Sequence, residues 1–578
     1  MRVLGISCFY HDAAAALVVD GTLAAAAGEE LFTRRKHDPE FPVNAAAFCL
    51  KKAGCRIDDI DYVAFYDKPI LKFDRLLTGC LATPFRSYRA FLSAMPIWLG
   101  RKLWVDHIIH NAIQYQGTVL YVPHHLSHAA GAFFGSPFER ATILTIDGVG
   151  EWATASVGVG DNNSVRLLRE MHYPHSVGLL YSAFTYYLGF RVNSAEYKLM
   201  GLAPYGRPRF APLIEDKLVK IHDDGSIHLD LDYFTFHSGL TMTGSRFEKL
   251  FGRPRRSPES PIDSFHEDVA ASIQAVTEKI VLTMARHVRE TTGLGKLCMA
   301  GGVALNCRAN GILLEQRIFD DVYVQPAAGD AGGAVGAALY VHYRLSGENK
   351  KPQPFFGIGP DYTEAEIRSF LDSNGIAYTC DAIDQQLAFL AQRISEGRIV
   401  ALFQGATEFG PRALGFRSVV ADPRDPGMKQ KINQAVKYRE AFRPFAPAVL
   451  AGDAAQYFDC RGESPCMLFT FNVKEDKRKV IPAVTHVDGS ARLQTVTRAD
   501  SPALHDLLLH FKRLTDLPVL LNTSFNLRGH PIVNTPTEAF ATFCSGGIDF
   551  LLMENYMMAK EQMSNELRRK FHVDGLSD

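Results

Sequence analysis

The stretch ATILTIDGVG, residues 141–150, decides the fold, because it joins an apolar strand to an Asp-Gly turn. A similar order stands at the start of the chain, where apolar residues 3–7 and a small-residue strand over 13–19 lead to Asp20-Gly21, and after residue 150 a second small-residue strand leads to the turn Asp161-Asn162-Asn163. Asp-Gly between apolar strands is a strong hairpin signal. Two such units predict an α/β domain built from a duplicated sheet, with a cleft between its halves.

The chain has 578 residues, which is too many for one hydrophobic core, so at least two domains are expected. We place the first domain at residues 1–345 and a polar linker rich in Gly and Pro at 346–362. A second domain over 363–560 opens with Thr363-Glu-Ala-Glu366, which has the spacing of a capping box. Residues 561–578 are expected to form a polar tail.

The composition excludes several classes of protein. The net charge is -1, so the chain as a whole attracts neither nucleic acid nor an anionic membrane, and we expect neither as a partner. The sequence contains no run of about 18 apolar residues, so no membrane-spanning helix is expected. The ten cysteines form no CxxC pair, which is typical of reduced thiols in a cytoplasm rather than of a zinc ribbon. We therefore expect a cytoplasmic protein.

Two histidines and two aspartates have the pattern of a metal site. His124 and His128 stand four residues apart, which puts both imidazoles on one helical face within reach of a single ion. Asp147 follows the strand over 141–146, and Asp330 precedes a helix in a Gly-rich segment. Such a donor set suits Fe(II), Mn(II) or Zn(II) rather than Ca(II). The residues alone also allow a plainer interpretation, in which the histidines cap a helix and the aspartates close turns.

Glycines beside these strands are suited to a nucleotide. Gly148 and Gly150 leave backbone N–H groups to face phosphate oxygens. Gly301 and Gly302 precede a helix expected from Asn306, whose N-terminus favours an anion or a ribose. Tight packing explains most glycine pairs, and that alternative stays open.

His11 and Asp12 follow the first strand and face the equivalent loop at Asp147. A histidine in this place is suited to general-base work on an acceptor hydroxyl, although a hydrogen-bonded turn histidine would have the same position. Glu196 lies with Lys198 in a loop flanked by Gly and Pro, where a surface salt bridge is the alternative.

The second domain carries cations among Gly, Pro and aromatic residues. Arg412, Lys437 and Arg443 lie in the segment 404–447, and Arg suits bidentate phosphate contacts where Lys supplies a point charge. Farther on, other polar side chains stand in or beside strands: Arg492, Asn522 and Arg528. Nucleic-acid binding and a structural ion-pair network are alternatives, but the chain has no basic excess, so a small phosphate-rich pocket is favoured.

Several motifs occur in the order found in one known family. They are HHLSH at 124–128, LTID at 144–147, EYKLMGLAPYG at 196–206, GGVALN at 301–306 and AAGD at 327–330. The chain resembles the carbamoyltransferases that include the nodulation-factor and aminoglycoside (tobramycin-type) enzymes. Its N-terminal part is similar to the tRNA threonylcarbamoyl transferase, of the actin, hexokinase and heat-shock-ATPase fold. Its C-terminal part is similar to the threonylcarbamoyl-adenylate synthase, an α/β domain.

The resemblance implies a two-step reaction. The first domain would hold iron, with Mn or Zn as substitutes, on His124, His128, Asp147 and Asp330. The second would join carbamate from carbamoyl phosphate to ATP, with Mg. Its ligands to carbamoyl phosphate would be Arg412, Lys437 and Arg443, and those facing ATP would be Arg492, Asn522 and Arg528. The carbamoyl adenylate would then react with a hydroxyl of a small molecule, as in antibiotic biosynthesis and natural-product tailoring. The residues that face this acceptor would be His11, Asp12 and Glu196.

The sequence departs from the family pattern at Leu31, Ala406 and Phe416, which concerns the fine contacts of both sites. Two other functions compete. A tRNA-modifying threonylcarbamoyl enzyme would need a broad basic face, of which the sequence gives only hints. A nucleotide-binding ATPase without transfer chemistry would leave the cations of the second domain unexplained. The sequence does not give the acceptor or the oligomeric state.

Overall fold

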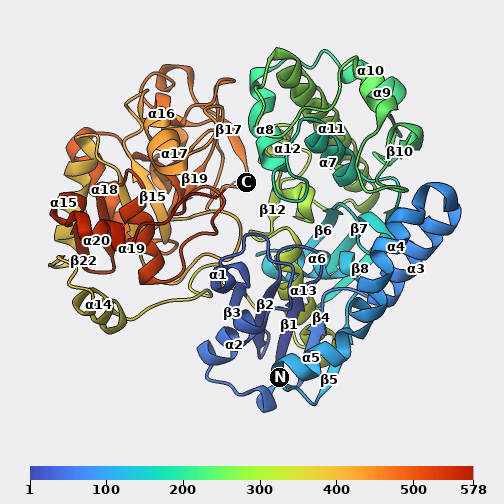
Figure 1. Ribbon diagram of the computed structural model, residues 1–578, viewed down its shortest axis with the longest axis horizontal. Coiled ribbons are helices and arrows are strands. Elements are labelled where there is room, and N and C mark those ends of the chain that lie inside the picture. The colour runs from blue at the N-terminus through green and yellow to red at the C-terminus, as the bar shows by residue number, and fades with distance from the viewer. Residues whose placement is uncertain (577–578) are drawn as a thin grey trace. The chain divides into compact units, whose positions relative to one another are not determined.

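The computed structural model describes residues 1–576, which form two compact units. Unit 1 comprises Met1–Glu29 and His37–Pro354, and unit 2 comprises Glu30–Lys36 and the chain from Phe355 onward. Figure 1 shows both as mixtures of helices and strands. Of the helices that the structure describes, none is long and apolar enough to cross a membrane.

Two five-stranded sheets of the same topology make up unit 1. The first has the order β3-β2-β1-β4-β5, in which β1, β2 and β3 are antiparallel and β4 and β5 run parallel to β1. The second has the order β8-β7-β6-β11-β12 with the same directions. The strands are β1 (Arg2–Ser7), β2 (Ala14–Val19), β3 (Thr22–Gly28), β4 (Tyr62–Phe65), β5 (Thr118–Tyr121), β6 (Arg140–Ile146), β7 (Ala153–Asp161), β8 (Ser164–His172), β11 (Lys296–Ala300) and β12 (Asp321–Val324). The predicted duplication of the sheet is confirmed.

Two buried helices link these sheets. α13 (Asp330–Ser346) packs on β1 and β2, α6 (His124–Gly135) packs on β6 and β11, and the two helices pack on each other. They approach closely because Gly336 has no side chain: a Cβ there would lie 1.8 Å from the Ser127 carbonyl oxygen. Since α6 begins at His124 and α13 begins at Asp330, this packing brings the two helix starts together.

The other elements of unit 1 surround these layers, and α3 and α4 form a helical pair at its margin (Figure 1). They are α2 (Val43–Lys52), α3 (Pro69–Ala82), α4 (Pro84–Gly100), α5 (Val105–Ile113), α7 (Val177–Tyr187), α8 (Glu196–Leu202), α9 (Ala211–Lys217), α10 (Ser245–Phe251), α11 (Ser264–Thr292), α12 (Cys307–Glu315), β9 (Val219–Ile221) and β10 (Ile227–Leu229).

Unit 2 is built on an eight-stranded mixed sheet of order β13-β22-β21-β14-β15-β20-β16-β19, beside a two-stranded sheet of β17 and β18. The strands are β13 (Thr379–Cys380), β14 (Val400–Phe403), β15 (Arg417–Ala421), β16 (Ala446–Leu450), β17 (Thr470–Asn472), β18 (Ser490–Arg492), β19 (Gln494–Val496), β20 (Val519–Ser524), β21 (Phe550–Met553) and β22 (Tyr556–Ala559). The helices are α1 (Glu30–Thr33), α14 (Glu364–Ser373), α15 (Ile383–Ser395), α16 (Met428–Ile432), α17 (Ala454–Tyr457), α18 (Pro502–Thr515), α19 (Pro536–Ser545) and α20 (Asn565–Lys570). Thr363 and Glu366 form the predicted capping box of α14.

The limits of the units differ from the expected domains in two places. Glu30–Lys36 belongs to unit 2, where Arg34 pairs with Glu538 at 3.1 Å and donates to the carbonyls of Pro531 and Ile532. The segment expected as a polar tail contains α20, and Leu567 packs against the core of unit 2. Both differences arise from partners far away in the sequence, which local patterns do not reveal.

Candidate metal centre and anion site

Four buried side chains of unit 1 converge at the starts of α6 and α13. His124, His128, Asp147 and Asp330 each offer one ligand atom, and these atoms lie within 4.8 Å of one another. The Nε2 atoms of His124 and His128 are 3.1 Å apart. Asp147 Oδ2 lies 3.1 Å from His124 Nε2, and Asp330 Oδ1 lies 3.7 Å from the Nε2 of each histidine. The structure thus brings together the four residues singled out from the sequence.

The chemistry of this group fits a divalent cation. If two nitrogen ligands each lie about 2.1 Å from one ion and the N–metal–N angle is a right angle, the nitrogens are about 3.0 Å apart. The Nε2 atoms of His124 and His128 are separated by a similar distance. Asp330 Oδ2 is buried without a hydrogen-bond partner, an arrangement that is costly unless something else satisfies the oxygen. Burial raises the pKa of Asp147, but the hydrogen bond from His124 and the charge of His128 outweigh it and hold that pKa well below its ordinary value. Imidazole and carboxylate donors together suit Fe(II), Mn(II) or Zn(II).

A second layer of contacts fixes the ligands. Glu151, which is buried, accepts a hydrogen bond from the backbone N–H of His124 at 3.0 Å and another from the backbone N–H of Lys68 at 2.8 Å. Gly302 donates its N–H to Asp147 Oδ1 at 2.7 Å. The sequence analysis did not identify Glu151, because its partners are backbone N–H groups and it belongs to no side-chain motif.

His11 is oriented toward the same group by Asp12. Its Nδ1 donates to Asp12 Oδ2 at 2.8 Å, and the other carboxylate oxygen of Asp12 accepts from His37 Nδ1 at 2.7 Å. This leaves His11 Nε2 4.0 Å from Asp330 Oδ2. Burial lowers the pKa of His11, but Asp330 and the hydrogen bond to Asp12 outweigh it and raise that pKa to about 9. A general base must be unprotonated, so the predicted role requires the charge of these carboxylates to be offset.

Helix α3 supplies two cations that the sequence did not single out. Lys72 pairs with the buried Asp67, and its Nζ lies 5.1 Å from the ring centre of Tyr66. Burial lowers the pKa of Lys72, but Asp67 and Asp330 outweigh it and raise that pKa. Arg75 donates to the Gly150 carbonyl at 3.0 Å. Both cations and carboxylates therefore surround the four candidate ligands.

The glycines expected to cradle phosphate divide into two kinds. A Cβ on Gly148 would meet no atom within 4 Å, so this residue borders open space. Gly150 is different: its N–H donates to the Ala153 carbonyl, and a Cβ would lie 2.9 Å from the His124 ring. Gly301 has a φ of +93°, and a Cβ there would lie 2.3 Å from the Ile146 carbonyl oxygen. The Gly150 N–H is thus paired with a backbone carbonyl, and close packing requires a glycine at both 150 and 301. A contact of these glycines with a nucleotide stays a prediction.

Asn306 and Glu196 have structural partners as well. Asn306 caps α12 by accepting from the Ala309 N–H, and its amide also exchanges hydrogen bonds with Gln274. Glu196 begins α8 and accepts from Ser182 Oγ at 2.8 Å. A contact of either side chain with a substrate stays a prediction.

In unit 2, Lys437 is buried at the end of a short π-turn, Asn433–Lys437. Its Nζ donates to the Ser524 carbonyl, to the Asn526 carbonyl at 3.1 Å and to Asn526 Oδ1 at 2.9 Å. Burial, followed by the charges of Arg439, Arg443 and Lys36, holds the pKa of Lys437 well below its ordinary value. Such a cluster of cations favours an anion beside it. Lys36, which belongs to unit 2, was not singled out from the sequence.

The remaining predicted residues of unit 2 lie along β20 and its neighbours. Asn522 is buried in β20, where its amide donates to Gln494 Oε1 at 2.7 Å and to the carbonyl of Ala413, next to Arg412. Arg492 ends β18, and Arg528 Nη1 lies 3.5 Å from the Tyr438 carbonyl, next to Lys437. Arg443 pairs with Glu440 at 3.7 Å. The strand β20 and the loop after it thus connect the surroundings of Arg412 with those of Lys437.

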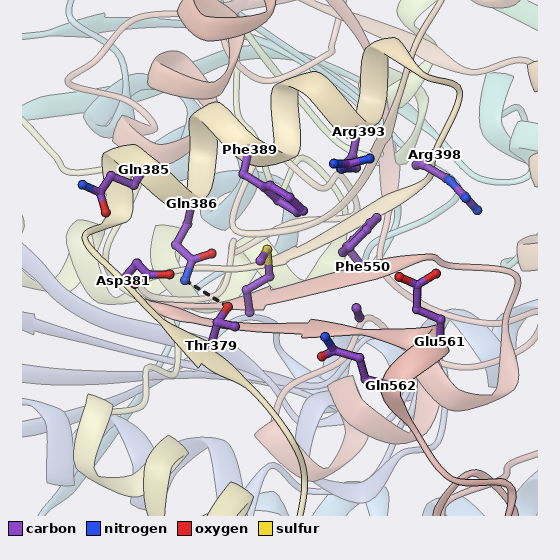
Figure 2. Close-up of a pocket in the computed structure, with 12 residues that line it drawn as sticks. Thr379, Asp381, Gln385, Gln386, Phe389, Arg393, Arg398, Phe550, Glu561 and Gln562 are labelled. Atoms are coloured by element: carbon purple, nitrogen blue, oxygen red, sulfur yellow. Dashed lines mark hydrogen bonds between the residues drawn. The ribbon is translucent and has the colours of Figure 1, made fainter.

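A hollow of about 420 Å³ in unit 2 lies elsewhere, between α15 and the strands β13, β21 and β22. Figure 2 shows that Phe389 from α15 and Phe550 point into it, with Arg393 and Arg398 at one end. It contains none of the residues that were singled out from the sequence.

Comparison with known proteins gives consistent matches along the chain. A family model described as the carbamoyltransferase N-terminus matches residues 2–339, and one described as the carbamoyltransferase C-terminus matches 391–560. An uncharacterized protein of Synechocystis sp., sll1178, is 48% identical over 99% of this chain and 100% of its own length. Nodulation protein NolNO of Sinorhizobium fredii is 39% identical over 96% of this chain and 80% of its own. A ROK hexokinase structure from Thermus thermophilus covers 59% of this chain and 98% of its own, with a TM-score of 0.27, which is too low to carry an argument.

Proposed function

The chain belongs to the carbamoyltransferase family and is an enzyme of carbamoyl transfer, and on that premise we propose a reaction in two steps. Unit 2 makes carbamoyl adenylate from carbamoyl phosphate and ATP. Unit 1 transfers the carbamoyl group from the adenylate to a hydroxyl of a small-molecule acceptor, a secondary metabolite.

The first step belongs to the cations of unit 2. Water cleaves carbamoyl phosphate to carbamate and inorganic phosphate. A carbamate oxygen then attacks the α-phosphorus of ATP, the bond to the β-phosphate breaks, and pyrophosphate leaves with Mg²⁺. Arg412, Lys437 and Arg443 hold carbamoyl phosphate, and Arg492, Asn522 and Arg528 face ATP. Fixed cations stabilise the charge that builds up on the transferring phosphate, a large term in phosphoryl chemistry.

The second step belongs to His11. Its Nδ1 donates to Asp12, so the neutral ring presents its Nε2 lone pair to an acceptor hydroxyl. His11 removes the hydroxyl proton while the acceptor oxygen attacks the carbamoyl carbon, and AMP leaves. Asp12 keeps the ring in the required tautomer, as the carboxylate partner of a catalytic histidine does in other enzymes. We assign Glu196 to the acceptor side of this site.

We assign the metal to His124, His128, Asp147 and Asp330, with Fe(II) as the native ion and Mn or Zn as substitutes. When bound, such an ion would offset the two buried carboxylates and hold a phosphate of the nucleotide. The backbone at Gly148 lies next to Asp147 and borders open space, where its N–H is suited to the same phosphate.

A single observation carries the proposal. In a chain of this family, His11 Nε2 lies 4.0 Å from Oδ2 of Asp330, and Asp330 is one of the four converging candidate ligands. A proton acceptor and a candidate cation site therefore share one region of unit 1. A base assists a hydroxyl that attacks a carbonyl, and a cation stabilises the charge on the phosphate that leaves.

Pyrophosphate release tests the proposal against its rivals. The purified chain is incubated with ATP, with and without carbamoyl phosphate, and pyrophosphate and phosphate are measured separately. We expect pyrophosphate only when carbamoyl phosphate is present, and unchanged release from His11→Ala, which lies outside the first step. Release that needs threonine and bicarbonate instead would favour the tRNA-type enzyme. Hydrolysis of ATP to ADP and phosphate alone would favour a nucleotide-binding ATPase.

A further inference from the structure

The helical pair α3 and α4 exposes an unusual amount of apolar surface. On α4, Phe85, Tyr88, Leu92 and Leu99 are 93%, 51%, 65% and 55% exposed. Their spacing of three, four and seven residues puts them on one face of the helix. Trp98, one residue before Leu99, instead faces α3, where its ring lies 5.8 Å from that of Phe73. The inner face of α4 is therefore packed, and its outer face carries an apolar stripe in contact with solvent.

The charge of this pair is one-sided. From Arg75 to Val105 the chain contains no Asp or Glu and five cations, Arg75, Arg86, Arg89, Arg101 and Lys102, although the whole chain has a net charge of -1. Two of these cations have partners in the body of unit 1: Arg75 donates to the Gly150 carbonyl, and Arg101 pairs with Glu40.

The other feature of α4 is that two arginines flank the exposed stripe. Arg86 and Arg89 are exposed and alternate with Phe85 and Tyr88 along the first turns of the helix. Arg89 Nε donates to Tyr88 Oη at 2.8 Å, so its guanidinium lies beside the stripe rather than on the opposite face. Apolar, aromatic and cationic side chains are thus mixed on one surface, which we call the α4 face: Phe85, Arg86, Tyr88, Arg89, Leu92 and Leu99.

We propose that the α4 face docks on the surface of a bilayer that contains anionic lipids. Helices that lie in the interfacial plane combine Phe, Trp and Leu on one side with Arg or Lys that meets the lipid phosphates. The cations attract the negative surface, and the apolar side chains enter the boundary between headgroups and acyl chains. The inference goes beyond the proposed reaction, since it concerns where the enzyme works and not how the carbamoyl group moves.

Charge decides between a bilayer and a second copy of the chain. A two-fold interface sets the same surface against itself, which would bring Arg86 and Arg89 toward those of the other copy. The whole stretch from Arg75 to Val105 has no acidic residue to neutralise them. A lipid surface supplies the missing negative charge and the apolar phase together.

Sedimentation with lipid vesicles tests the inference. The full chain is mixed with vesicles of phosphatidylcholine alone or of phosphatidylcholine with phosphatidylglycerol, and the bound fraction is measured. We expect binding to the anionic vesicles that falls as salt rises, because salt screens surface charge. Phe85→Asp/Leu92→Asp should lower the partition coefficient about tenfold or more. The control Leu514→Asp, at an exposed leucine of α18 in unit 2, should leave it unchanged.

A charge-reversed variant gives a second, independent measurement. Arg86→Glu/Arg89→Glu should also weaken binding about tenfold or more. Arg166→Glu/Lys220→Glu makes the same change in net charge at exposed positions of unit 1 and should bind as the unaltered chain does. Each variant should keep its cooperative unfolding and its pyrophosphate release, which separates this proposal from the proposed function.

Two results would overturn the inference. One is the absence of binding to anionic vesicles by the folded, unaltered chain. The other is self-association in sedimentation equilibrium without lipid that Phe85→Asp/Leu92→Asp abolishes, since the α4 face would then belong to a second copy.

Discussion

Glu151→Gln is the sharpest test of how the fold supports the candidate metal centre. The carboxylate of Glu151 accepts from the N–H of His124, the first residue of α6, and from the N–H of Lys68, just before α3. These N–H groups have no partner within their own helices, so Glu151 caps two helices at once. The substitution keeps the shape of the side chain and removes its charge.

The contacts give the size of the effect. Glu151 Oε1 lies 2.8 Å from the Lys68 nitrogen and 3.0 Å from that of His124, and Oε2 lies 3.1 Å from the latter. In Gln the amide oxygen can keep the place of Oε1, but the amide NH₂ would then face the His124 N–H. Two charge-assisted bonds become neutral ones, at a cost of about 1 kcal/mol each. We expect a loss of about 1–2 kcal/mol in the free energy of unfolding. A loosened His124 should weaken metal affinity roughly tenfold, the low end for such supporting residues.

Two assays on the same protein separate these effects. Urea unfolding of the metal-free chain gives the stability, and competition with a chelator gives the affinity for Mn(II) or Fe(II). Glu139→Gln is the matched control, since it removes the same charge at an exposed position. An unchanged metal affinity beside lowered stability would refute the reasoning, because Glu151 would then hold the helices without positioning the ligand.

Three further predictions concern the predicted site residues. His124→Ala or Asp330→Ala should remove bound metal and abolish transfer while pyrophosphate release survives; full metal content, measured by elemental analysis, would end this assignment. His11→Ala should slow transfer roughly 10²–10⁴-fold, the usual effect of a lost general base, in single-turnover kinetics with carbamoyl adenylate; an unchanged rate would remove His11 from the step. Burial and neighbouring cations hold the pKa of Lys437 in the folded chain below its unfolded value of about 10.4. Between these two pKa values the unfolded chain binds one more proton than the folded chain, so the free energy of unfolding rises with pH. Lys437→Met should reduce that rise in urea titrations at several pH values, and an identical slope would contradict it.

Local turn chemistry made the duplicated domain predictable. Asp20-Gly21 forms the turn between β2 and β3, Asn162-Asn163 forms the equivalent turn between β7 and β8, and a turn signal needs only neighbours in sequence. Asp147-Gly148 instead begins the longer loop between β6 and β7, which corresponds to the loop between β1 and β2. The placement of Glu30–Lys36 in unit 2 was not predictable in this way, because Arg34 meets Glu538 across most of the chain.

The group of four candidate metal ligands was predictable from the sequence for a similar reason. Its histidines share a helix face, and its aspartates stand at element ends that this fold brings together. Long-range contacts set the rest: Glu151 binds backbone groups, and Lys437 is buried against Ser524 and Asn526. The basic stretch from Arg86 to Lys102 was visible in the sequence as a hint of a basic face, but its place on an exposed helix beside apolar side chains was not.

The central claim is that activation and transfer take place at separate sites, and Lys437→Ala supplied with preformed carbamoyl adenylate tests it most directly. The variant should release no pyrophosphate from ATP and carbamoyl phosphate, because the anion site has lost its buried cation. With the adenylate supplied, it should still carbamoylate an acceptor, detected by mass spectrometry, because the metal group and His11 are intact. No carbamoylated product from a folded variant with its full metal content, under conditions where the unaltered chain makes it, would contradict the account.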